Sequence, residues 1–352
     1  MVGLERTVVP LLGSETFGLG EGAALGAFVI SFGVSKAVFN LLAGALADRI
    51  GRKGVLLAGW VLGLPLPFLL IWAPSWNYVI AANLLLGMNQ ALTWSMTVNM
   101  MVDLVPPGRR GFAAGINEFS GYLGVSLLAF LTGLLAAAYD LRPEPFYLGI
   151  GVAVVGLAIA AVVPETASAL KPSPFGWVRG VGTPSLLGAA TNLKDGLVWL
   201  AIPLLLAARE FELAEIGVVA GLYPLVWAAG QLAFGPLSDL WGRSHLIRAG
   251  MALQGFGLLA LATASGYGLA LLTAVLLGLG TGMVYPTLIA AVADRVAAED
   301  RATALGIYRF FRDGGYALGA GVMMAGVLDL GAAVVATGAG VLALTLVTWR
   351  RI

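Results

Sequence analysis

The sequence predicts an all-α integral membrane protein built from two related bundles of six helices each. Three observations lead to this fold class. The chain is 59% hydrophobic and only 11% charged, whereas the surface of a globular domain is largely polar. Apolar runs of about 18 or more residues recur along the chain, and this is the length that a membrane helix needs. A charged motif in the first half also returns in the second half.

The repeated motif lies between two apolar runs in each half. Its first copy is Gly44-Ala-Leu-Ala-Asp48-Arg49-Ile-Gly51-Arg52-Lys53, and its second copy is Gly235-Pro-Leu-Ser-Asp239-Leu-Trp-Gly242-Arg243. Gly44, Asp48, Gly51 and Arg52 each lie 191 positions before their counterparts in the second copy, and the same offset relates Gly87 to Gly278. One offset that holds through loops and helices indicates a duplication. Internal repeats of this kind are typical of transporter folds.

The composition excludes several classes of protein. The chain contains no Cys, so disulfides, thiolate metal sites and thiol redox chemistry are excluded. With His245 as the single histidine, a histidine metal cluster is excluded as well, and we expect neither a metal nor another cofactor. A formal net charge of +1 argues against nucleic acid as a partner. No phosphate loop and no nucleophile–base pattern stands out, so we do not expect an enzyme.

The apolar runs predict the helices in chain order. In the first half they are Gly22–Ala47, Gly54–Trp72, Tyr78–Val102, Phe112–Ala138 and Phe146–Val163. In the second half they are Pro184–Ala208, Ile216–Leu237, Leu246–Ala264, Gly268–Val292, Thr303–Leu328 and Leu330–Trp349. Residues 164–183 are rich in Pro, Ser and Gly and are predicted to form a linker. The predicted domains are therefore residues 1–163 and 184–352.

The first helix is predicted to be incomplete. The helix that begins at Pro184 has its counterpart, by the offset of 191 residues, seven residues before Met1. The segment from Met1 to about Leu12 provides roughly 18 Å of helix at 1.5 Å per residue, which is less than the ~30 Å hydrocarbon core. We therefore expect an upstream start or a trimmed chain. A first helix that is short by nature is the alternative.

The basic residues of the loops predict the orientation in the membrane. Only Arg142 and Arg209 lie at one end of the predicted helices, whereas thirteen Lys and Arg residues lie at the other end. These thirteen are Arg49, Arg52, Lys53, Arg109, Arg110, Lys171, Arg179, Arg243, Arg248, Arg295, Arg301, Arg350 and Arg351. Positively charged loops face the cytoplasm. We therefore expect a multi-pass protein of the cytoplasmic (inner or plasma) membrane, with its hinges, linker and C-terminus inside.

Nine charged residues remain within the apolar runs and are the candidates for substrate binding and coupling. A charge near the bilayer centre costs at least ~2.5–3.5 kcal/mol on insertion scales, so it normally faces protein or a wet cavity. Lys36, Glu118 and Arg309 each lie eight residues from the charged end of their helix, which is ~12 Å at helical rise. The nine residues are Glu5, Arg6, Lys36, Glu118, Lys194, Asp195, Arg309, Arg312 and Asp313.

Some of these charges have a structural interpretation. Arg309 and Asp313 are four residues apart on one helix face, which permits an internal ion pair. The neighbours Lys194–Asp195 and Glu5–Arg6 are candidates for pairs that hold helices in register. The aromatic residues in the middle of the runs also suit the lining of a pocket, although packing is the general expectation for any one of them. They are Trp94, Trp199, Tyr223, Trp227, Tyr285 and Tyr308.

The repeated motif resembles the signature loop of the major facilitator superfamily, and the resemblance covers essentially the whole chain. It implies two six-helix halves that rock about a central cavity and expose it alternately to each side. It also implies a cytoplasmic gate made of the motif residues. These are Gly44, Asp48, Arg49, Gly51, Arg52, Lys53, Gly235, Asp239, Gly242 and Arg243.

The resemblance implies how this gate works. An acid can stabilise the positive N-terminal end of a neighbouring helix, and the family implies that Asp48 faces the helix that begins near Arg301. Asp239 would likewise face the helix that begins near Arg110. The motif arginines would bridge to Asp103 or Asp294. Such contacts form when the cytoplasmic side closes and so bias a two-state equilibrium. Ser244 replaces the lysine of the first copy, which predicts a weaker charge network in the second.

Two positions depart from patterns within this family. Asn83 lies four residues before Gly87, where many proton-driven members have Arg, and this puts the usual fourth-helix route to proton coupling in doubt. The run Gly115–Gly133 contains no Pro, whereas drug antiporters often have a Gly-Pro signature in the fifth helix. This departure lowers the expectation of a multidrug exporter.

Together these features predict a secondary active transporter for an organic anion or amphipathic acid, since Lys36, Arg309 and Arg312 bring positive charge to the cavity. Glu118 is the candidate proton carrier, because a desolvated carboxyl holds its proton more tightly. The expected partners are a small-molecule solute, a proton and the lipid bilayer, and we expect a monomer. The alternatives are an exporter of lipophilic or cationic compounds and a non-transporting membrane sensor on the same fold.

Overall fold

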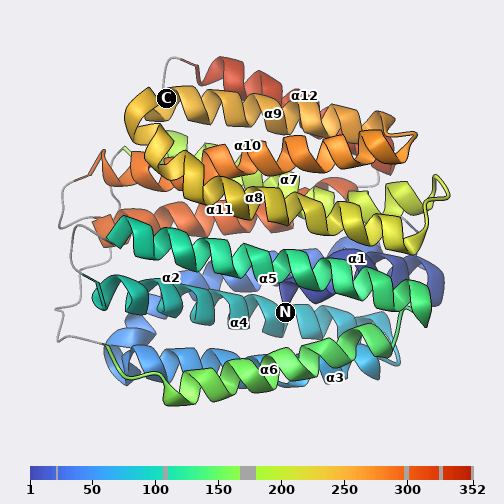
Figure 1. The fold of residues 1–352 in the computed structure, drawn as a ribbon, viewed down its shortest axis with the longest axis horizontal. Helices are drawn as coiled ribbons and strands as arrows, with labels where there is room; N and C mark the ends of the chain where they lie inside the picture. The colour runs from blue at the N-terminus through green and yellow to red at the C-terminus, as the bar shows by residue number, and fades with distance from the viewer. Residues whose placement is uncertain (21–22, 106–109, 167–179, 297–300, 325–327, 350–352) are drawn as a thin grey trace.

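Long helices that run roughly parallel and antiparallel to one another form the protein (Figure 1). The computed structural model describes residues 1–20, 23–105, 110–166, 180–296, 301–324 and 328–349. Within these ranges every regular element is helical. The connection between α8 and α9 lies at the left of Figure 1, and those between α7 and α8 and between α9 and α10 lie at the right. We call the left end, which contains both motif copies, the hinge end.

The helices of the first half include one more segment than the sequence predicts. They are α1 (Val2–Leu11), which continues as the wider helical segment η1 (Leu12–Thr16), α2 (Ala23–Gly63), α3 (Pro65–Ile71), α4 (Trp76–Asp103), α5 (Arg110–Ala138) and α6 (Glu144–Val162). Helix α2 contains the second predicted helix and most of the third, with a kink at Gly51. The predicted run Gly54–Trp72 is divided at Pro65, because proline lacks the N–H that would continue the helix.

The second half follows the predicted order of six helices. They are α7 (Gly182–Ala207), α8 (Leu213–Trp241), α9 (Arg243–Thr263), α10 (Tyr267–Ala293), α11 (Arg301–Met324) and α12 (Leu330–Val347). With α2 counted on both sides of Gly51, and α3 counted with the second arm as one span, each half contains six helical segments, and the predicted fold class is confirmed. The first helix extends to Thr16, further than the Leu12 that the sequence predicts.

Nine segments of the described residues are long and apolar enough to cross a membrane. They come from both arms of α2, the second including α3, and from α5, α6, α7, α8, α9, α10 and α12. Helices α4 and α11 are not among them. Helix α11 carries Arg309, Arg312 and Asp313, and α4 carries several Asn and Gln side chains. These two helices therefore depend on the rest of the bundle to cover their polar groups.

Equivalent glycines form the turns in the two motif copies. Gly51 has φ 77° and Gly242 has φ 87°, a left-handed backbone that glycine adopts without the steric cost of a Cβ. The backbone N–H groups of Arg52 and Lys53, just after the first turn, donate to the carboxylate of Glu165 at 3.1 and 3.0 Å. An acidic group at the start of a helix satisfies unpaired donors and the helix dipole. Sequence analysis did not identify this role of Glu165.

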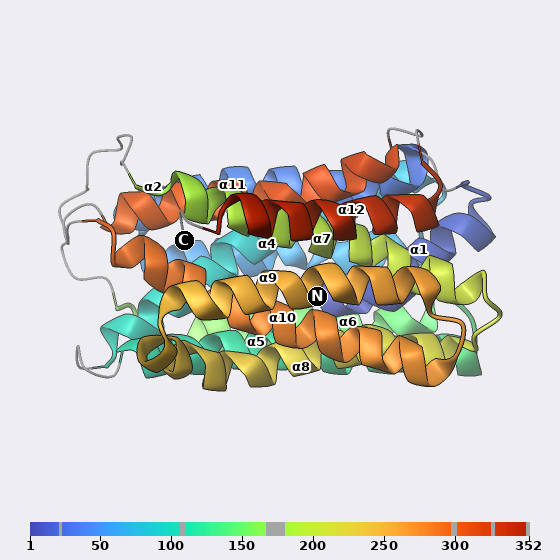
Figure 2. The ribbon, with the colours of Figure 1, turned by 90° about the horizontal axis from the view of Figure 1, so that it is seen from above.

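The two halves meet along α2 with α11 and along α5 with α8, and α1 also packs against α7 (Figure 2). The closest approach of α5 and α8 lies at the end opposite the hinges. There a Cβ added to Gly133 would lie 2.6 Å from the Cα of Gly217. The backbones are therefore in direct contact, and the halves are closed against each other at this end.

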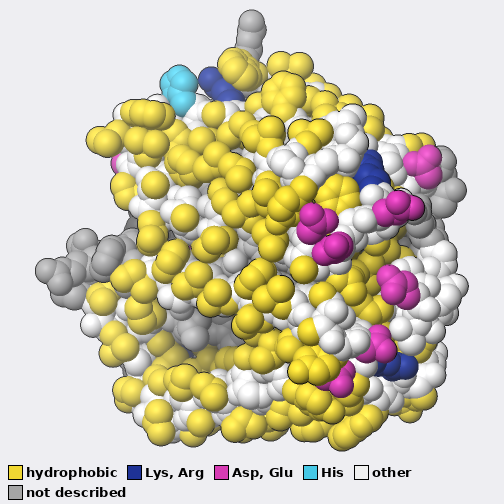
Figure 3. Space-filling model, turned by 45° about the vertical axis from the view of Figure 1, so that its right-hand side comes forward, with side chains coloured by type: hydrophobic (Ala, Val, Ile, Leu, Met, Phe, Trp, Pro, Cys, Tyr) yellow, Lys and Arg dark blue, Asp and Glu magenta, His cyan; other side chains and the backbone are white. Residues whose placement is uncertain are grey.

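The outer surface is largely apolar. Side chains of Val61, Trp72, Val162, Leu240 and Leu346 are all more than half exposed. The face drawn in Figure 3 is dominated by hydrophobic side chains, with the acidic ones gathered toward one side. Such a surface is typical of a protein whose solvent is the hydrocarbon of a bilayer.

Several expectations concern residues that the structure does not describe. Most of the predicted linker, residues 167–179, lies outside the described residues, as do Arg109, Lys171, Arg179, Arg350 and Arg351. The side chains of Asp48, Asp103, Arg110 and Arg301 are likewise not described, and so is the packing of Gly44. The predicted contacts of Asp48 and Asp103 across the gate therefore remain predictions.

The contact between α5 and α8 gives a testable prediction. We expect Gly133→Ala to lower the free energy of unfolding by about 1–3 kcal/mol, because the added methyl group overpacks a contact between two backbones. Thermal unfolding of the purified protein in detergent measures this change. Gly151→Ala is the matched control, since a Cβ there meets no atom within 4 Å. Equal melting temperatures for the two variants would contradict the close contact.

Candidate functional site

A small cavity lies between the two halves, midway along the helices. Its volume is about 20 Å³, roughly enough for one water molecule. Residues from α2, α4 and α5 of the first half and from α10 and α11 of the second half line it. These are Lys36, Asn40, Trp94, Ser95, Glu118, Tyr122, Tyr285, Ile289, Arg309 and Arg312. We call this space the central cavity; it brings together four of the nine predicted candidate residues.

Glu118 is the carboxylate of the central cavity. The indole Nε1–H of Trp94 donates to its Oε1 at 2.6 Å. Its Oε2 is buried and, among the described residues, has no hydrogen-bond partner. A buried carboxylate with a free oxygen either carries a proton or faces a group that binds it. Glu118 therefore has the surroundings of a group that changes its partner or its protonation state.

Two cations of the cavity have no carboxylate partner. Within the described part of the chain, neither Lys36 nor Arg309 forms a salt bridge. The Lys36 ammonium lies 5.4 Å from the ring centre of Phe32 and 5.3 Å from that of Tyr316, and cation–π contacts offset only part of the cost of burying a charge. With Glu118 as the opposing charge, the cavity carries an excess of positive charge.

Arg312, the third cation, is neutralised by its neighbour in the chain. Its Nε and Nη2 donate to Asp313 at 2.7 and 3.0 Å, and its guanidinium stacks 4.6 Å from the ring centre of Tyr285. The sequence suggested Arg309 as the partner of Asp313, at a spacing of four residues. The structure pairs Asp313 with Arg312 instead, so Arg309 is left facing the cavity.

Asp313 also connects the halves. The amide of Asn40 on α2 donates to it at 2.5 Å, and that of Asn192 on α7 donates at 3.2 Å. Ser95 on α4 in turn donates to Asn40 at 3.0 Å. Sequence analysis missed Asn40 and Ser95, since uncharged polar residues in an apolar run carry little signal alone. Asn40 lies one helical turn after Lys36, and this spacing is the signal that would have placed it in the same site.

The remaining candidate charges form a second cluster outside the central cavity. Arg6 on α1 donates to both oxygens of Asp195 on α7 at 3.0 and 2.9 Å, and both residues are buried. Tyr223 donates to Asp195 at 2.9 Å, and Lys194 donates to Tyr223 and Thr281 at 2.6 and 2.8 Å. The suggested neighbour pairs are therefore wrong, because neighbours on a helix point in different directions.

Glu5 remains without a partner. It is fully buried, and neither carboxylate oxygen has a hydrogen-bond partner among the described residues. Its position on α1 is separate from the residues that line the central cavity.

One contact that the resemblance implies, between Arg243 and Asp294, is present in the second motif copy. Arg243 pairs with Asp294 at 3.2 Å and with Asp239 at 2.5 Å, and it also donates to the hydroxyl of Ser238. Asp239 therefore binds the arginine of its own motif. In the first copy, Arg52 donates to the backbone carbonyl of Asn99 at 3.2 Å, and Arg49 is exposed.

A larger cleft lies between the central cavity and the hinge end. Its volume is about 480 Å³, and its walls come from α5, α8 and α10. Glu118 and Ile289 line both spaces. Asp239 and Arg243 lie at the other end of the cleft. We call it the hinge cleft.

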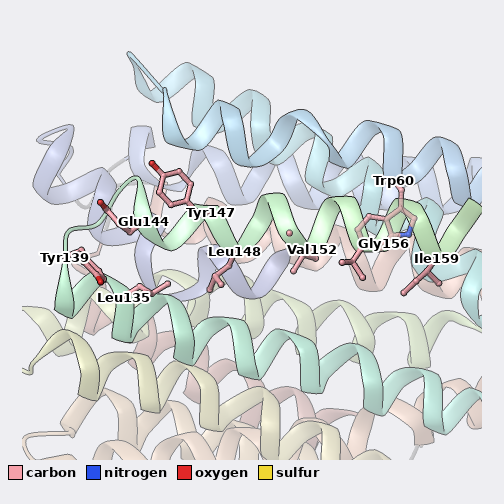
Figure 4. Close-up of a pocket in the computed structure, with 11 residues that line it drawn as sticks. Trp60, Leu135, Tyr139, Glu144, Tyr147, Leu148, Val152, Gly156 and Ile159 are labelled. Atoms are coloured by element: carbon pink, nitrogen blue, oxygen red, sulfur yellow. The ribbon is translucent and has the colours of Figure 1, made fainter.

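A third hollow lies on the outer face of the first half (Figure 4). This groove of about 860 Å³ is lined by α6 and by residues of α5 and α2, including Trp60, Leu135 and Val152. None of the nine candidate charges lines it. Its position on the apolar surface separates it from the central cavity.

The sequence and the fold agree on the family. The sequence profile of the Major Facilitator Superfamily matches residues 3–191 and again residues 184–352. The chain therefore belongs to the Major Facilitator Superfamily, and the family model matches each half separately, as the duplication predicts. A relative by sequence is synaptic vesicle glycoprotein 2A of Rattus norvegicus, which is 30% identical over 158 residues. That match takes in 43% of this chain and only 20% of the length of the relative.

Solved structures of transporters have the same fold. The xylose transporter XylE of E. coli, in a partially occluded inward open conformation, matches with a TM-score of 0.76 and 15% identity over 100% of this chain and 94% of its own. The human organic anion transporter MFSD10 matches with a TM-score of 0.72 and 17% identity over 99% of this chain and 96% of its own. The chain is thus a multi-pass membrane protein of a transporter family.

The buried Arg6–Asp195 pair gives a second prediction. We expect Asp195→Asn to lower the free energy of unfolding by about 3–5 kcal/mol, because Arg6 then remains buried without its counter-charge. Denaturant titration in detergent measures the change. Asp239→Asn breaks a pair whose acid is 62% exposed, and it is the control with an expected loss of at most about 1 kcal/mol. A similar loss in both variants would contradict a special role of the buried pair.

Proposed function

We propose that this protein is a secondary active transporter of the cytoplasmic membrane that moves an organic anion through the central cavity by alternating access. The observation that carries the proposal is the presence of Lys36 and Arg309, two cations without a carboxylate partner among the described residues, on opposite halves of one cavity. An anion bound between them would supply the missing counter-charge and touch both moving parts.

Arg309 suits this role by its chemistry. A guanidinium presents several donors in one plane and binds a carboxylate through two parallel hydrogen bonds. Arg312 cannot do the same without releasing Asp313, to which it already donates twice. The structural similarity to an organic anion transporter is consistent with this assignment, although at 17% identity it bears on the fold alone.

We further propose that Glu118 carries a coupled proton. Its free Oε2 lies in the cavity that would hold the anion. When Glu118 is ionised, it competes with an anion for the two cations; when it is protonated, the cavity gains positive charge. Protonation therefore favours anion binding, and the proton and the anion move together.

The side of the membrane that the hinge end faces decides which state this conformation represents. If this end faces the cytoplasm, as the positive charges predict, the hinge cleft leads from Glu118 to the cytoplasm. The opposite end is closed where Gly133 meets Gly217. The state is then inward-facing, like that described for the xylose transporter of similar fold.

Export of a lipophilic cation is the second candidate. Glu118 lies beside the aromatic residues Trp94, Tyr122 and Tyr285, and such rings bind organic cations. Because a cationic solute cannot neutralise Lys36 and Arg309, this function would require another anionic group to balance their charge. Transport assays with lipophilic cations and with organic anions separate the two candidates.

The proton-carrier role gives a third prediction. We expect Glu118→Gln to abolish uptake driven by a pH gradient in proteoliposomes, since the amide cannot release a proton. Exchange of labelled for unlabelled solute should continue, because it needs no net proton movement. Glu15→Gln changes an exposed carboxylate and should alter neither activity. Proton-driven uptake that persists in Glu118→Gln would refute this role.

The anion site gives a fourth prediction. We expect Arg309→Ala to weaken anion binding about 10- to 150-fold, the usual effect of losing a charge-assisted hydrogen bond. Arg309→Lys retains the charge but not the planar donor pair, so it should recover part of the affinity. Isothermal titration with the reconstituted protein measures both. Equal affinity in wild type and Arg309→Ala would show that the anion binds elsewhere or not at all.

A further inference from the structure

The central cavity is too small to hold a whole organic solute. Its volume of about 20 Å³ lies far below the roughly 300–1,000 Å³ of ordinary small-molecule sites. The hinge cleft, at about 480 Å³, lies within that range. If a solute binds in the conformation described here, only its charged group lies close to Lys36 and Arg309. The rest of the molecule must occupy an adjoining space.

The hinge cleft adjoins the cavity directly. Glu118 and Ile289 belong to the lining of both, and α5, α8 and α10 lie together in Figure 2. Most of the cleft wall next to this junction is apolar, including Leu232, Pro286 and Ala290. The two spaces therefore adjoin as one site, with cations in the central cavity and an apolar stretch of cleft wall beside it, before the charged residues of the hinge end.

Next to the junction one uncharged polar side chain lies in the wall, whereas Ser238, Asp239 and Arg243 line the hinge end of the cleft. Gln231 on α8 is 5% exposed, and its amide nitrogen has no hydrogen-bond acceptor among the described residues. A buried donor of this kind normally has a partner, which is often a water molecule or a ligand. The occupant of the cleft therefore has room for one polar contact within an otherwise apolar body.

From this geometry we infer that the substrate is a compact amphipathic acid. Its anionic head binds Arg309 and Lys36 in the central cavity, and its apolar body lies in the hinge cleft against α5, α8 and α10. The inference rests on the proposed anion transport and adds the shape and polarity of the substrate. Inorganic anions and short polar acids have no apolar part to fill the cleft, so we do not expect them to be the substrate.

The position of Glu118 couples binding of the apolar part of the solute to protonation of the Glu118 carboxyl group. Because Glu118 lies at the junction of the two spaces, an apolar body that passes from one into the other lies against its carboxyl group. An ionised carboxylate loses hydration when apolar atoms cover it, whereas the neutral acid loses far less. The bound solute therefore favours protonated Glu118, and the solute and the proton bind as a pair.

The absence of cysteine makes the cleft accessible to a direct test. In Ala290→Cys, the single thiol lies on the cleft wall, and a water-soluble maleimide reports whether it is covered. In nanodiscs we expect 5-phenylpentanoate to slow the labelling at least tenfold. Acetate, which is a head group without a body, and 5-phenylpentan-1-ol, which is the body without a charge, should leave the rate unchanged.

A filling variant tests the same inference by affinity. A Cβ added to Gly115 on the cleft wall meets no atom within 4 Å, so Gly115→Leu fills the space without a clash at its first atom. We expect it to weaken 5-phenylpentanoate binding at least tenfold and to leave acetate binding unchanged. Gly151→Leu, on the outer groove and equally free of contacts, is the matched control and should change neither.

The outcomes distinguish the two levels of the proposal. If 5-phenylpentanoate binds in an Arg309-dependent way but neither protects Ala290→Cys nor responds to Gly115→Leu, the anion site stands and the cleft inference is wrong. If neither anion binds at any concentration tested, the proposed anion transport fails as well. Protection by the alcohol alone would identify the cleft as an apolar site unrelated to the anion.

Discussion

Compensation of buried charge is the constraint on which this structure depends. In a bilayer each uncompensated charge costs several kcal/mol, so the embedded acids and bases must meet one another, polar groups or solute. The Arg6–Asp195 pair meets this requirement fully and joins α1 to α7. Asp313 meets it through Arg312, Asn40 and Asn192. Lys36 and Arg309 do not, and both line the central cavity between the two halves.

The same constraint explains why the two ends of the molecule differ. At the end opposite the hinges, small residues let α5 and α8 touch by their backbones, so these two helices close against each other there. At the hinge end the contacts seen in the second motif copy are ion pairs of partly exposed side chains. Exposed pairs contribute little stability each and can exchange partners at small cost. Both pairs join elements of the second half, so they hold the hinge ends of α8, α9 and α10 together.

The site arises because the duplicated halves are no longer identical. Glu118 and Arg309 occupy equivalent positions 191 residues apart, yet one is an acid and the other a base. After duplication, this divergence placed opposite charges on the two walls of one cavity. A solute that binds Arg309 therefore also affects Glu118 through its charge and its body. In the proposed mechanism, this pairing of unlike residues at equivalent positions couples the solute to the proton.

The sequence alone predicts the membrane class, the duplicated helices and the nine charges within the apolar runs, because these depend on local composition and on a repeat with a constant offset. It does not predict which side chains these charges contact. Pairing Arg6 with Asp195, leaving Arg309 free beside Glu118, and bringing Asn40 to Asp313 depend on the rotation and packing of helices far apart in the chain. Periodicity specifies which face a residue occupies but not which helix meets that face. Only the tertiary structure decides which helix packs against that face.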